Sequence, residues 1–514
     1  MRRVPMLAGS RIALVDAPDD GVVLRPPPPG EPIADVGSAV RDALRFPLAG
    51  DPLEALVPRD GRATVVVEPP SLPLPGAPND PRRDAIAAVV DELTRIGVPQ
   101  QKQTLLVAGG LGRRLAERDL PQLDIVSPEF ARRFHGRVVV HDVEDPEHVE
   151  IGQAGRLPLL VNRALVETDA IVVVTAAETV LHGGPAALVG ASGRETLRAA
   201  GAYSLLETSA SQGWKTGVEI ERELMRRVPM IGASLTLNPP SMTGAARGYP
   251  YEPDAVERMA RSPLRKAFGL LPPPVRYWAI KSLRRELSLA AAFGGPPSVA
   301  HAEAMLRGIE SRSTQLDGQL DALVISIPQM TPHLPRERPN PLLAAYLGLA
   351  LALRLWRDAF PVVEGGTAIL MHRFHRKFSH PTQQPYRAFF QATRFGREPE
   401  ELASAERAAV ADERSLAAYR SGRSCHPLLP FADWAACAPA VGRLGAVIVA
   451  GCHDSVAARQ LGFVPTRGVN AALEMAHGRA GGPPRVGFLL SPPYFPLRVA
   501  KEPPPRRRSG DERA

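Results

Sequence analysis

The sequence has few cysteines, few aromatic residues and no long apolar run. Among its 514 residues are only three cysteines, Cys425, Cys437 and Cys452. Three are too few for a disulfide framework, and this usage is typical of a reducing compartment. No apolar run reaches the roughly 18 residues that a membrane-spanning helix needs, and the N-terminal stretch lacks the apolar core of a signal peptide. We therefore expect a cytoplasmic protein.

The chain has an excess of positive charge, because it contains 62 Lys and Arg residues but only 54 Asp and Glu residues, which gives a net charge of +8. The arginines are scattered and form no stripe with interleaved aromatic residues, as a nucleic-acid-binding surface would. We therefore expect no nucleic-acid partner, and a membrane is not expected as a partner either. Proline and glycine, by contrast, are abundant, with 54 and 44 residues.

Apolar, β-branched runs alternate with helical spacing along the first half of the chain. The predicted strands are Ala63–Val67, Gln103–Val107, Val138–Val140, Ala170–Thr175 and Met230–Leu237. Asp84–Ile96 has apolar residues at helical spacing, which predicts an amphipathic helix. Alternating strands and helices are typical of a mostly parallel sheet covered on both faces. We predict an α/β domain over residues 8–237, with a return segment to it over 288–320.

The second half repeats this pattern. The predicted strands are Ala322–Ile327, Thr367–Met371, Ala446–Ala450 and Arg485–Leu490, separated by helical stretches. They predict a second α/β domain over residues 321–500. The fold class is therefore α/β, with two domains built on mostly parallel sheets. Residues 501–514 are rich in Pro and Arg and are predicted to be a disordered basic tail.

Residues 238–287 depart from the rhythm of the first domain. This insertion contains Pro239-Pro240 and a basic apolar segment from Leu264 to Leu287. It is either a lid, a surface helix that touches an acidic partner or a membrane, or an insertion packed on the domain edge with solvated cations.

Polar residues follow several predicted strands of the first domain. His182 precedes Gly183 and Gly184 in the loop after Ala170–Thr175, Glu68 follows Ala63–Val67, and Arg113 follows a glycine-rich turn. In open α/β sheets, ligands bind beyond the carboxyl ends of the strands. His182 and Glu68 are therefore candidate catalytic residues that move a proton. Arg113, Gly183, Gly184 and Ser71, the last in the loop after Glu68, are candidates for binding an anionic substrate. Alternatively, His182 caps its loop and Arg113 pairs with a surface acid.

A second candidate is the loop after Thr367–Met371, where His372 and His375 lie three residues apart. Such spacing suits a metal, but Arg373, Arg376 and Lys377 would repel a cation. We therefore predict no metal here, and assign His372 and His375 to binding a phosphate or carboxylate. A solvated basic loop is the alternative.

Ten blocks of sequence occur in an order that resembles the lactate racemase-like family. They read SAVRDALRFPLAGDPLEAL, ATVVVEPPSLPLP, TLLVAGGLGRR, VVVHDVEDPEHVEIG, LPLLVNRALVETDAIVVV, HGGPAALVGASGRETL, AAAFGGPPSVAHAEAM, DALVISIP, VVEGGTAILM and FVPTRGVNAALEMA. The resemblance implies two α/β domains with a cleft between them. In the racemases themselves, that cleft holds a covalently attached nickel-pincer cofactor, and two histidines act on a 2-hydroxy acid.

Several positions depart from the family pattern. The resemblance implies an arginine that holds the substrate carboxylate at Leu72, a catalytic histidine at Gly112 and the lysine that tethers the cofactor at Ala186. A histidine ligand of nickel is implied near Gly201. An alkyl chain cannot replace a guanidinium on a carboxylate, and without an acid–base pair no group returns the proton. We therefore expect no nickel-pincer cofactor.

Two functions follow from this resemblance and these departures. The first is a divergent lactate racemase-like enzyme acting on a small 2-hydroxy acid or similar anion in the interdomain cleft. The second is a non-catalytic pseudoenzyme that serves as a module binding a metabolite or a protein. In both, the expected ligand is a small anionic metabolite.

Overall fold

Six strands form the first sheet, and their order in space is β13-β10-β9-β4-β5-β6. The computed structural model describes residues 2–69, 80–121, 125–177, 183–201, 211–282, 285–329, 339–378 and 380–500. The strands are β4 (Ala63–Val67), β5 (Gln103–Val107), β6 (Arg137–Val140), β9 (Ala170–Ala177), β10 (Met230–Leu237) and β13 (Leu289–Gly295). β4, β9 and β10 are buried along their whole length, as their continuous apolar sequences predict. Five strands run parallel, and β13 pairs with β10 in the antiparallel sense.

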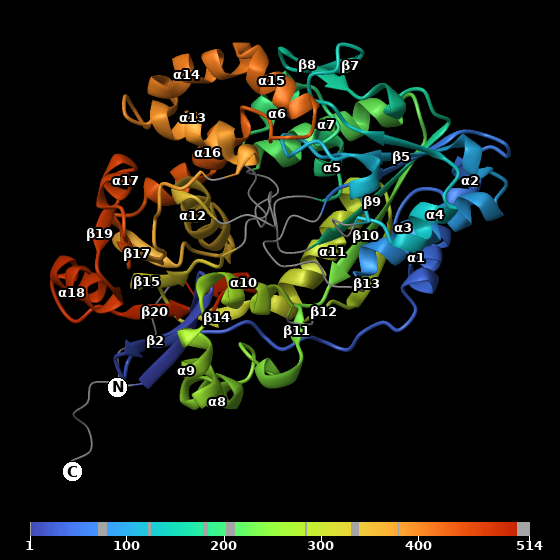
Figure 1. The fold of residues 1–514 in the computed structure, drawn as a ribbon. Coiled ribbons are helices and arrows are strands. Elements are labelled where there is room, and N and C mark those ends of the chain that lie inside the picture. The colour runs from blue at the N-terminus through green and yellow to red at the C-terminus, as the bar shows by residue number, and fades with distance from the viewer. Residues whose placement is uncertain are drawn as a thin grey trace.

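Helices cover both faces of the first sheet (Figure 1). One apolar core lies between the sheet and α1 (Val36–Arg45) and α3 (Pro81–Arg95). The opposite core includes residues of α5 (Ala186–Val189), α6 (Arg194–Ala200) and α7 (Gln212–Met225). α11 (Pro297–Arg312) packs on β10 and β13.

The second sheet has the order β19-β18-β17-β15-β20-β3, and all its strand pairs are parallel. Its strands are β15 (Leu320–Ser326), β17 (Val362–Met371), β18 (Ala446–Ala450), β19 (Val464–Thr466), β20 (Val486–Leu489) and β3 (Val22–Leu24). The fold class predicted from the sequence, two α/β units with mostly parallel sheets, is confirmed. The edge strand β3 comes from the N-terminus, within the range assigned from the sequence to the first domain.

The N-terminal hairpin also lies with the second sheet. β1 (Arg2–Ala8) and β2 (Arg11–Ala17) pair over seven residues each, and their apolar side chains share a core with β15, β17 and α18 (Val469–Ala480). The Gly9 N–H at the hairpin tip donates to the Ile327 carbonyl, at 2.7 Å. Residues 2–24 are therefore part of the second unit.

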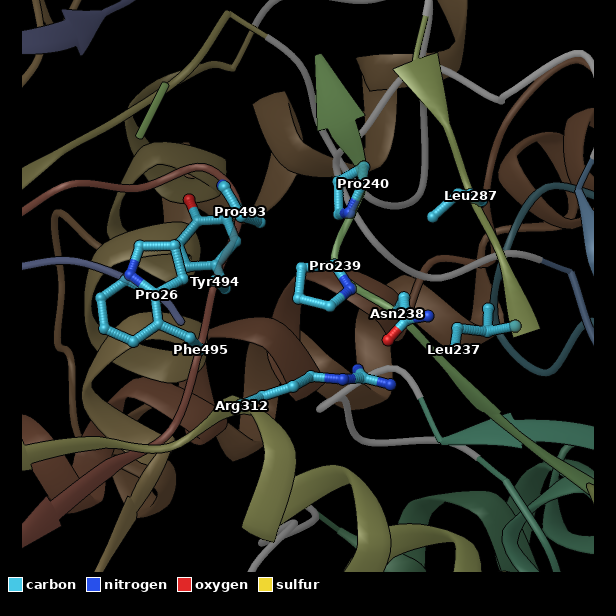
Figure 2. A pocket seen from close by; sticks show the side chains of 10 residues that line it. All are labelled: Pro26, Leu237, Asn238, Pro239, Pro240, Leu287, Arg312, Pro493, Tyr494 and Phe495. Atoms are coloured by element: carbon cyan, nitrogen blue, oxygen red, sulfur yellow. The ribbon is translucent and has the colours of Figure 1, made fainter. Parts of the chain in front are cut away.

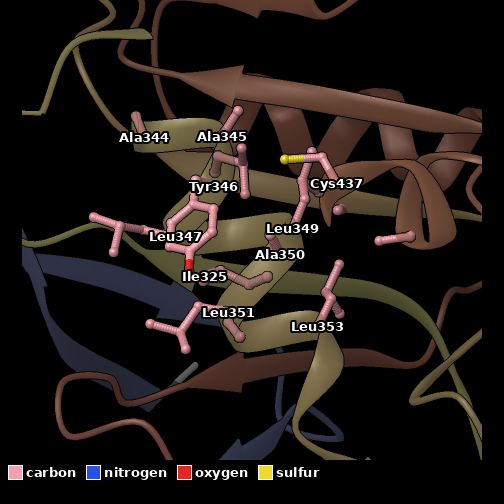
Figure 3. Close-up of a cluster of buried hydrophobic side chains, with 14 of the residues drawn as sticks. Ile325, Ala344, Ala345, Tyr346, Leu347, Leu349, Ala350, Leu351, Leu353 and Cys437 are labelled. Carbon is pink, nitrogen blue, oxygen red and sulfur yellow. The ribbon is translucent and has the colours of Figure 1, made fainter. Parts of the chain in front are cut away.

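The other face of the second sheet is covered by a largely apolar helical stretch. This stretch consists of α12 (Pro341–Ala345), a π-helical segment η5 (Tyr346–Leu351) and a 3₁₀ turn, η6 (Ala352–Arg354). Figure 3 shows its buried side chains together with Ile325 of β15 and Cys437 of α16 (Leu429–Val441). Further helices in this part of the chain are α13 (Gln384–Ala392), α14 (Pro399–Ala411), α15 (Glu413–Arg420) and α17 (Ser455–Gln460).

The predicted insertion forms three helices and a two-stranded ribbon. These are α8 (Pro253–Arg261), α9 (Pro263–Leu270), α10 (Pro273–Ser282), β11 (Ser241–Met242) and β12 (Arg285–Glu286). α8 packs on β1, and α9 packs on β2. Among the residues that the structure describes, no helix combines the length and apolarity needed to cross a membrane.

Candidate functional site between the two sheets

A small, partly open pocket lies where the chain leaves the carboxyl ends of strands from both sheets. Leu237 ends β10 and Asn238 to Pro240 follow it, Pro26 follows β3, and Pro493 to Phe495 follow β20. Leu287 and Arg312 complete its lining (Figure 2). The carboxyl edge of a parallel sheet is where α/β proteins bind ligands. This cavity is therefore our candidate functional site.

Among the described residues of the lining, Arg312 is the only one with a charged side chain, and it lies at the end of α11. Its side chain is buried and donates a hydrogen bond to the carbonyl of Ala177, the last residue of β9, at 2.9 Å. Ala300, Ala304 and Gly308 precede it on the same buried face of α11. These small residues allow the helix to approach β10 closely, so that the guanidinium reaches the strand ends.

A second buried arginine, Arg285 of β12, lies near this cavity. The Tyr251 hydroxyl donates to the carbonyl of Pro240 at 2.6 Å, and both Arg285 and Arg312 act electrostatically on Tyr251. Burial lowers the pKa of Arg285 to about 10. Within the described ranges, Nε and Nη1 of Arg285 have no hydrogen-bond partner. The cavity wall is thus apolar, while its surroundings are cationic.

Asn238 is a polar side chain of the wall, and hydrogen bonds hold it in place. Its Oδ1 accepts from the Gly30 N–H at 3.1 Å, and its Nδ2 donates to the Gly30 carbonyl and to Ser288 Oγ. These bonds tie the strand exit of β10 to the N-terminal segment and to the start of β13. The four prolines of the lining further restrict the backbone.

Gly183 and Gly184 lie against the ring of the buried His301 of α11. A Cβ on Gly183 would lie 2.0 Å from His301 Cε1, and one on Gly184 would lie 2.4 Å from His301 Cβ. The Gly184 N–H donates to Thr175 Oγ1 at 2.9 Å, and Ser234 Oγ is 2.8 Å from His301 Nδ1. Burial lowers the pKa of His301 to about 3, so the ring is neutral near pH 7.

Comparison with known proteins identifies the first half of the chain. Residues 9–212 match the family model for the lactate racemase N-terminal domain. Residues 9–212 therefore belong to the family of lactate racemase N-terminal domains. No curated protein matches the chain.

Two solved structures are similar to this chain. The lactate racemase apoprotein from Thermoanaerobacterium thermosaccharolyticum has a TM-score of 0.60 and 13% identity, over 97% of this chain and 100% of that one. A protein from Thermotoga maritima has a TM-score of 0.49 and 13% identity, over 92% and 100%. At this identity, the first likeness shows a shared fold and nothing further.

The first-domain residues singled out in the sequence of this lactate racemase-like protein are not all described. His182, Ser71 and Leu72 lie outside the described residues. Glu68 is half-buried at the carboxyl end of β4. Arg113 is half-buried, with Nη2 at 3.9 Å from a carboxylate oxygen of Asp119.

The second candidate loop lies at the carboxyl edge of the other sheet. The His372 Nδ1 accepts from the Phe374 N–H at 3.1 Å, and the His375 ring lies 4.9 Å from the ring of His453. The His453 N–H donates to the Arg373 carbonyl, which joins the loops after β17 and β18. In the described part of the chain, no group of three or more His, Cys, Asp or Glu side chains is arranged to hold a metal ion.

Arg312 and Arg285 were not predicted from the sequence as site residues. The available signal was a spacing of four on one face of α11, where Ala300, Ala304 and Gly308 lead to an arginine. Small residues at this spacing predict a closely packed helix face. An arginine at the end of that face is then expected to be buried as well, provided that the helix extends to it. For Arg285, the sequence holds no comparable signal.

Proposed function

We propose that this lactate racemase-like protein binds a small carboxylate, such as a 2-hydroxy acid, in the cavity beside Arg312. The observation that carries the proposal is a buried guanidinium at the carboxyl edges of both sheets, in a wall whose other described residues are uncharged. A guanidinium pairs with a carboxylate through two hydrogen bonds, and an apolar surrounding strengthens that attraction.

The wall also suits the rest of such a ligand. Leu237, Leu287 and Phe495 offer apolar contact to a short alkyl group, and the prolines hold the cavity in shape. None of the described lining residues is acidic. Arg285 near Tyr251 adds a second positive charge.

We further propose that binding occurs without the tethered nickel-pincer cofactor. Ala186, where the resemblance implies the tethering lysine, is a buried first residue of α5 and carries only a methyl group. Gly112, where it implies a catalytic histidine, has no side chain at all. These residues do not fit a covalently held metal complex, because they provide neither an amine nor an imidazole.

Binding without catalysis is the form of the proposal that the lining favours. A racemase needs a group that takes and returns a proton near pH 7. Burial raises the pKa of Tyr494 in the wall far above that range. Asn238 does not titrate. The alternative is that the protein is an enzyme that uses His182 and Glu68. In that case it would racemise lactate.

The test is a thermal-shift titration with D-lactate, L-lactate and the uncharged analogue lactamide. We expect both lactates to raise the melting temperature with concentration, and lactamide to have little effect. Arg312→Met should abolish the shift, while Arg307→Met, on the exposed side of the same helix, should preserve it. An equal shift in the Arg312→Met protein would refute the assignment of the site.

Two further measurements separate the parts of the proposal. Stoichiometric nickel in the purified protein would contradict the absence of the cofactor. Racemisation of lactate that disappears in His182→Ala would favour the enzyme over the binding module.

A further inference from the structure

The turn between α9 and α10 presents a continuous apolar surface to solvent. Residues 270–275 read Leu-Leu-Pro-Pro-Pro-Val, and all six are exposed. Leu270 is 88% exposed and Val275 43% exposed. Trp278, one turn into α10, is 68% exposed, and Leu264 at the start of α9 is 66% exposed. Single exposed apolar residues are common, but a contiguous group of them marks a contact surface.

The charges within the segment that forms this apolar tip have one sign, although Arg261 at its start pairs with Glu257 of α8 at 3.3 Å. Residues 261–282 contain five basic residues and no acidic one, although Asp and Glu make up 54 of the 514 residues of the chain. Arg261, Arg265 and Lys266 precede the tip by one to three helical turns. An apolar tip with cations behind it is complementary to an anionic surface that has an apolar interior.

The tip is also held in a defined shape by Arg276. This side chain is 2% exposed, and its Nη1 donates to the carbonyls of Gly269, at 3.1 Å, and Leu271. The Leu271 N–H donates to the Phe268 carbonyl, and the Arg276 N–H to the Pro272 carbonyl. Three consecutive prolines fix the backbone between them. The leucines are therefore displayed by an ordered turn.

The insertion carries this tip away from the first sheet. α9 packs on the hairpin strand β2, and Figure 1 shows α8 and α9 at the periphery of the molecule, near the N-terminus. The exposed hairpin residues Arg2, Arg3 and Arg11 belong to the strands on which α8 and α9 pack.

We propose that the α9–α10 tip docks on the surface of an anionic lipid bilayer. Leu270, Leu271 and Trp278 enter the interfacial layer, while Arg265 and Lys266 face the anionic headgroups. Leucine and tryptophan are favoured at this depth, and each nearby cation adds attraction to an anionic leaflet. The proposal departs from the expectation drawn from the sequence that a membrane is not a partner, because the exposure of the tip is visible only in the fold.

The experiment is vesicle flotation of the full chain with phosphatidylcholine vesicles and with vesicles that also contain phosphatidylglycerol. We expect binding to the anionic vesicles that weakens with salt, and little binding to phosphatidylcholine alone. Leu270→Ser combined with Leu271→Ser should reduce the bound fraction about tenfold, since two buried leucines are removed from the contact. Arg265→Gln with Lys266→Gln should reduce binding chiefly at low salt.

Matched controls make the result specific to the tip. Phe395→Ser removes a side chain that is 90% exposed elsewhere, and Arg132→Gln with Arg133→Gln removes two exposed cations of α4 (Pro128–Arg133). Both should bind as the wild type does. Tryptophan fluorescence should shift to the blue on vesicle binding, and Trp278→Phe should remove that shift.

Three outcomes would overturn the proposal. The first is no binding to anionic vesicles, and the second is equal binding by the double leucine variant. The third is that vesicles are not bound and that sedimentation velocity shows a dimer, which the double leucine variant does not form. That result would mean that the tip contacts a second copy of the chain.

Discussion

Gly183 and Gly184 show how a pair of residues is fixed by one neighbour. Both have positive φ, +131° and +52°, and both lie where the His301 ring leaves no room for a side chain. Their backbone is also tied to β9 through the bond from the Gly184 N–H to Thr175. The requirement for glycine here therefore arises from packing as well as from backbone conformation.

We expect Gly183→Ala to lower the free energy of unfolding by about 3 kcal/mol, because the new methyl group overlaps a fully buried ring and the backbone is strained. Gly109→Ala is the control, since nothing lies within 4 Å of its added Cβ. Urea unfolding of both variants measures the difference. Equal stabilities would show that the His301 ring moves aside without cost.

The buried histidines predict how stability depends on pH. Burial lowers the pKa of both His141 and His301 to about 3, against about 6.5 in the unfolded chain. The unfolded state therefore binds more protons between these values, so stability is complete above pH 6.5 and is lost as the pH falls toward 3.

At pH 5.5, each of these histidines should reduce the unfolding free energy by about 1.4 kcal/mol relative to pH 7.5. Urea unfolding at both pH values tests this. His301→Gln should remove its own share of the pH dependence while leaving that of His141. An unchanged slope in the variant would contradict the assignment.

At the scale of elements, α11 connects the first sheet to the cavity. Its first turn is held by the buried carboxylate of Glu221 on α7, which accepts from the Ser298 N–H at 3.0 Å and from Ser298 Oγ at 2.9 Å. Its middle carries His301, and its end carries Arg312. A shift of this one helix would therefore move the cation in the cavity wall.

Glu221→Ala should cost about 2 kcal/mol of stability, because the start of α11 loses both a hydrogen-bond acceptor and a favourable negative charge. It should also weaken the thermal shift by lactate. Glu219→Ala, which removes a carboxylate paired with Arg222 on the same helix, is the control and should change stability by less than about 0.5 kcal/mol. A normal lactate response in Glu221→Ala would mean that Arg312 is positioned independently of the helix start.

The short apolar strands of the first sheet were predictable from the sequence. The runs at Ala63–Val67, Gln103–Val107 and Met230–Leu237 form strands with the predicted bounds. Such strands are buried on both faces, so their local composition reflects their environment. The place of β3 in the second sheet was not predictable, because its partner β20 lies more than 450 residues further along the chain.

The candidate site was predictable only in outline. The carboxyl edges of the strands were expected to bind a ligand, and the cavity lies there. Arg312 was missed because its burial depends on the approach of α11 to β9 and β10. Roles for His182, Glu68, Ser71, Arg113, His372 and His375 stay predictions.

At the scale of the whole molecule, a polar contact joins the first unit to the helices after β17. Glu144 accepts from Arg194 Nη1 at 3.0 Å and lies 2.9 Å from Nε2 of the buried His426. The Val143 N–H donates to the Tyr419 hydroxyl at 3.2 Å. Burial acts to raise the pKa of Glu144, but His426 and Arg194 together lower it below its usual value.

Glu144→Ala should lower the unfolding free energy by about 3 kcal/mol, since Arg194 and His426 lose their shared carboxylate in a buried setting. Amide hydrogen exchange should become faster at Val143 and at residues 419–428. Arg198→Ala removes a more exposed contact to Glu406 between the same parts and should have a small effect. If the two variants behave alike, the buried contact does not hold the units together.

The N-terminal hairpin and β3 have a consequence for dissecting the protein. A fragment cut at the match to the family model would keep residues 9–24 but lose β15, β18 and β20, the strands that cover them. Its strands β2 and β3, left without β1 and β20, would invite aggregation. Truncation from both sides, to about residues 31–312, preserves every strand of the first sheet and should give the more soluble product. During synthesis, β3 likewise cannot pair with β20 until almost the entire chain has been made.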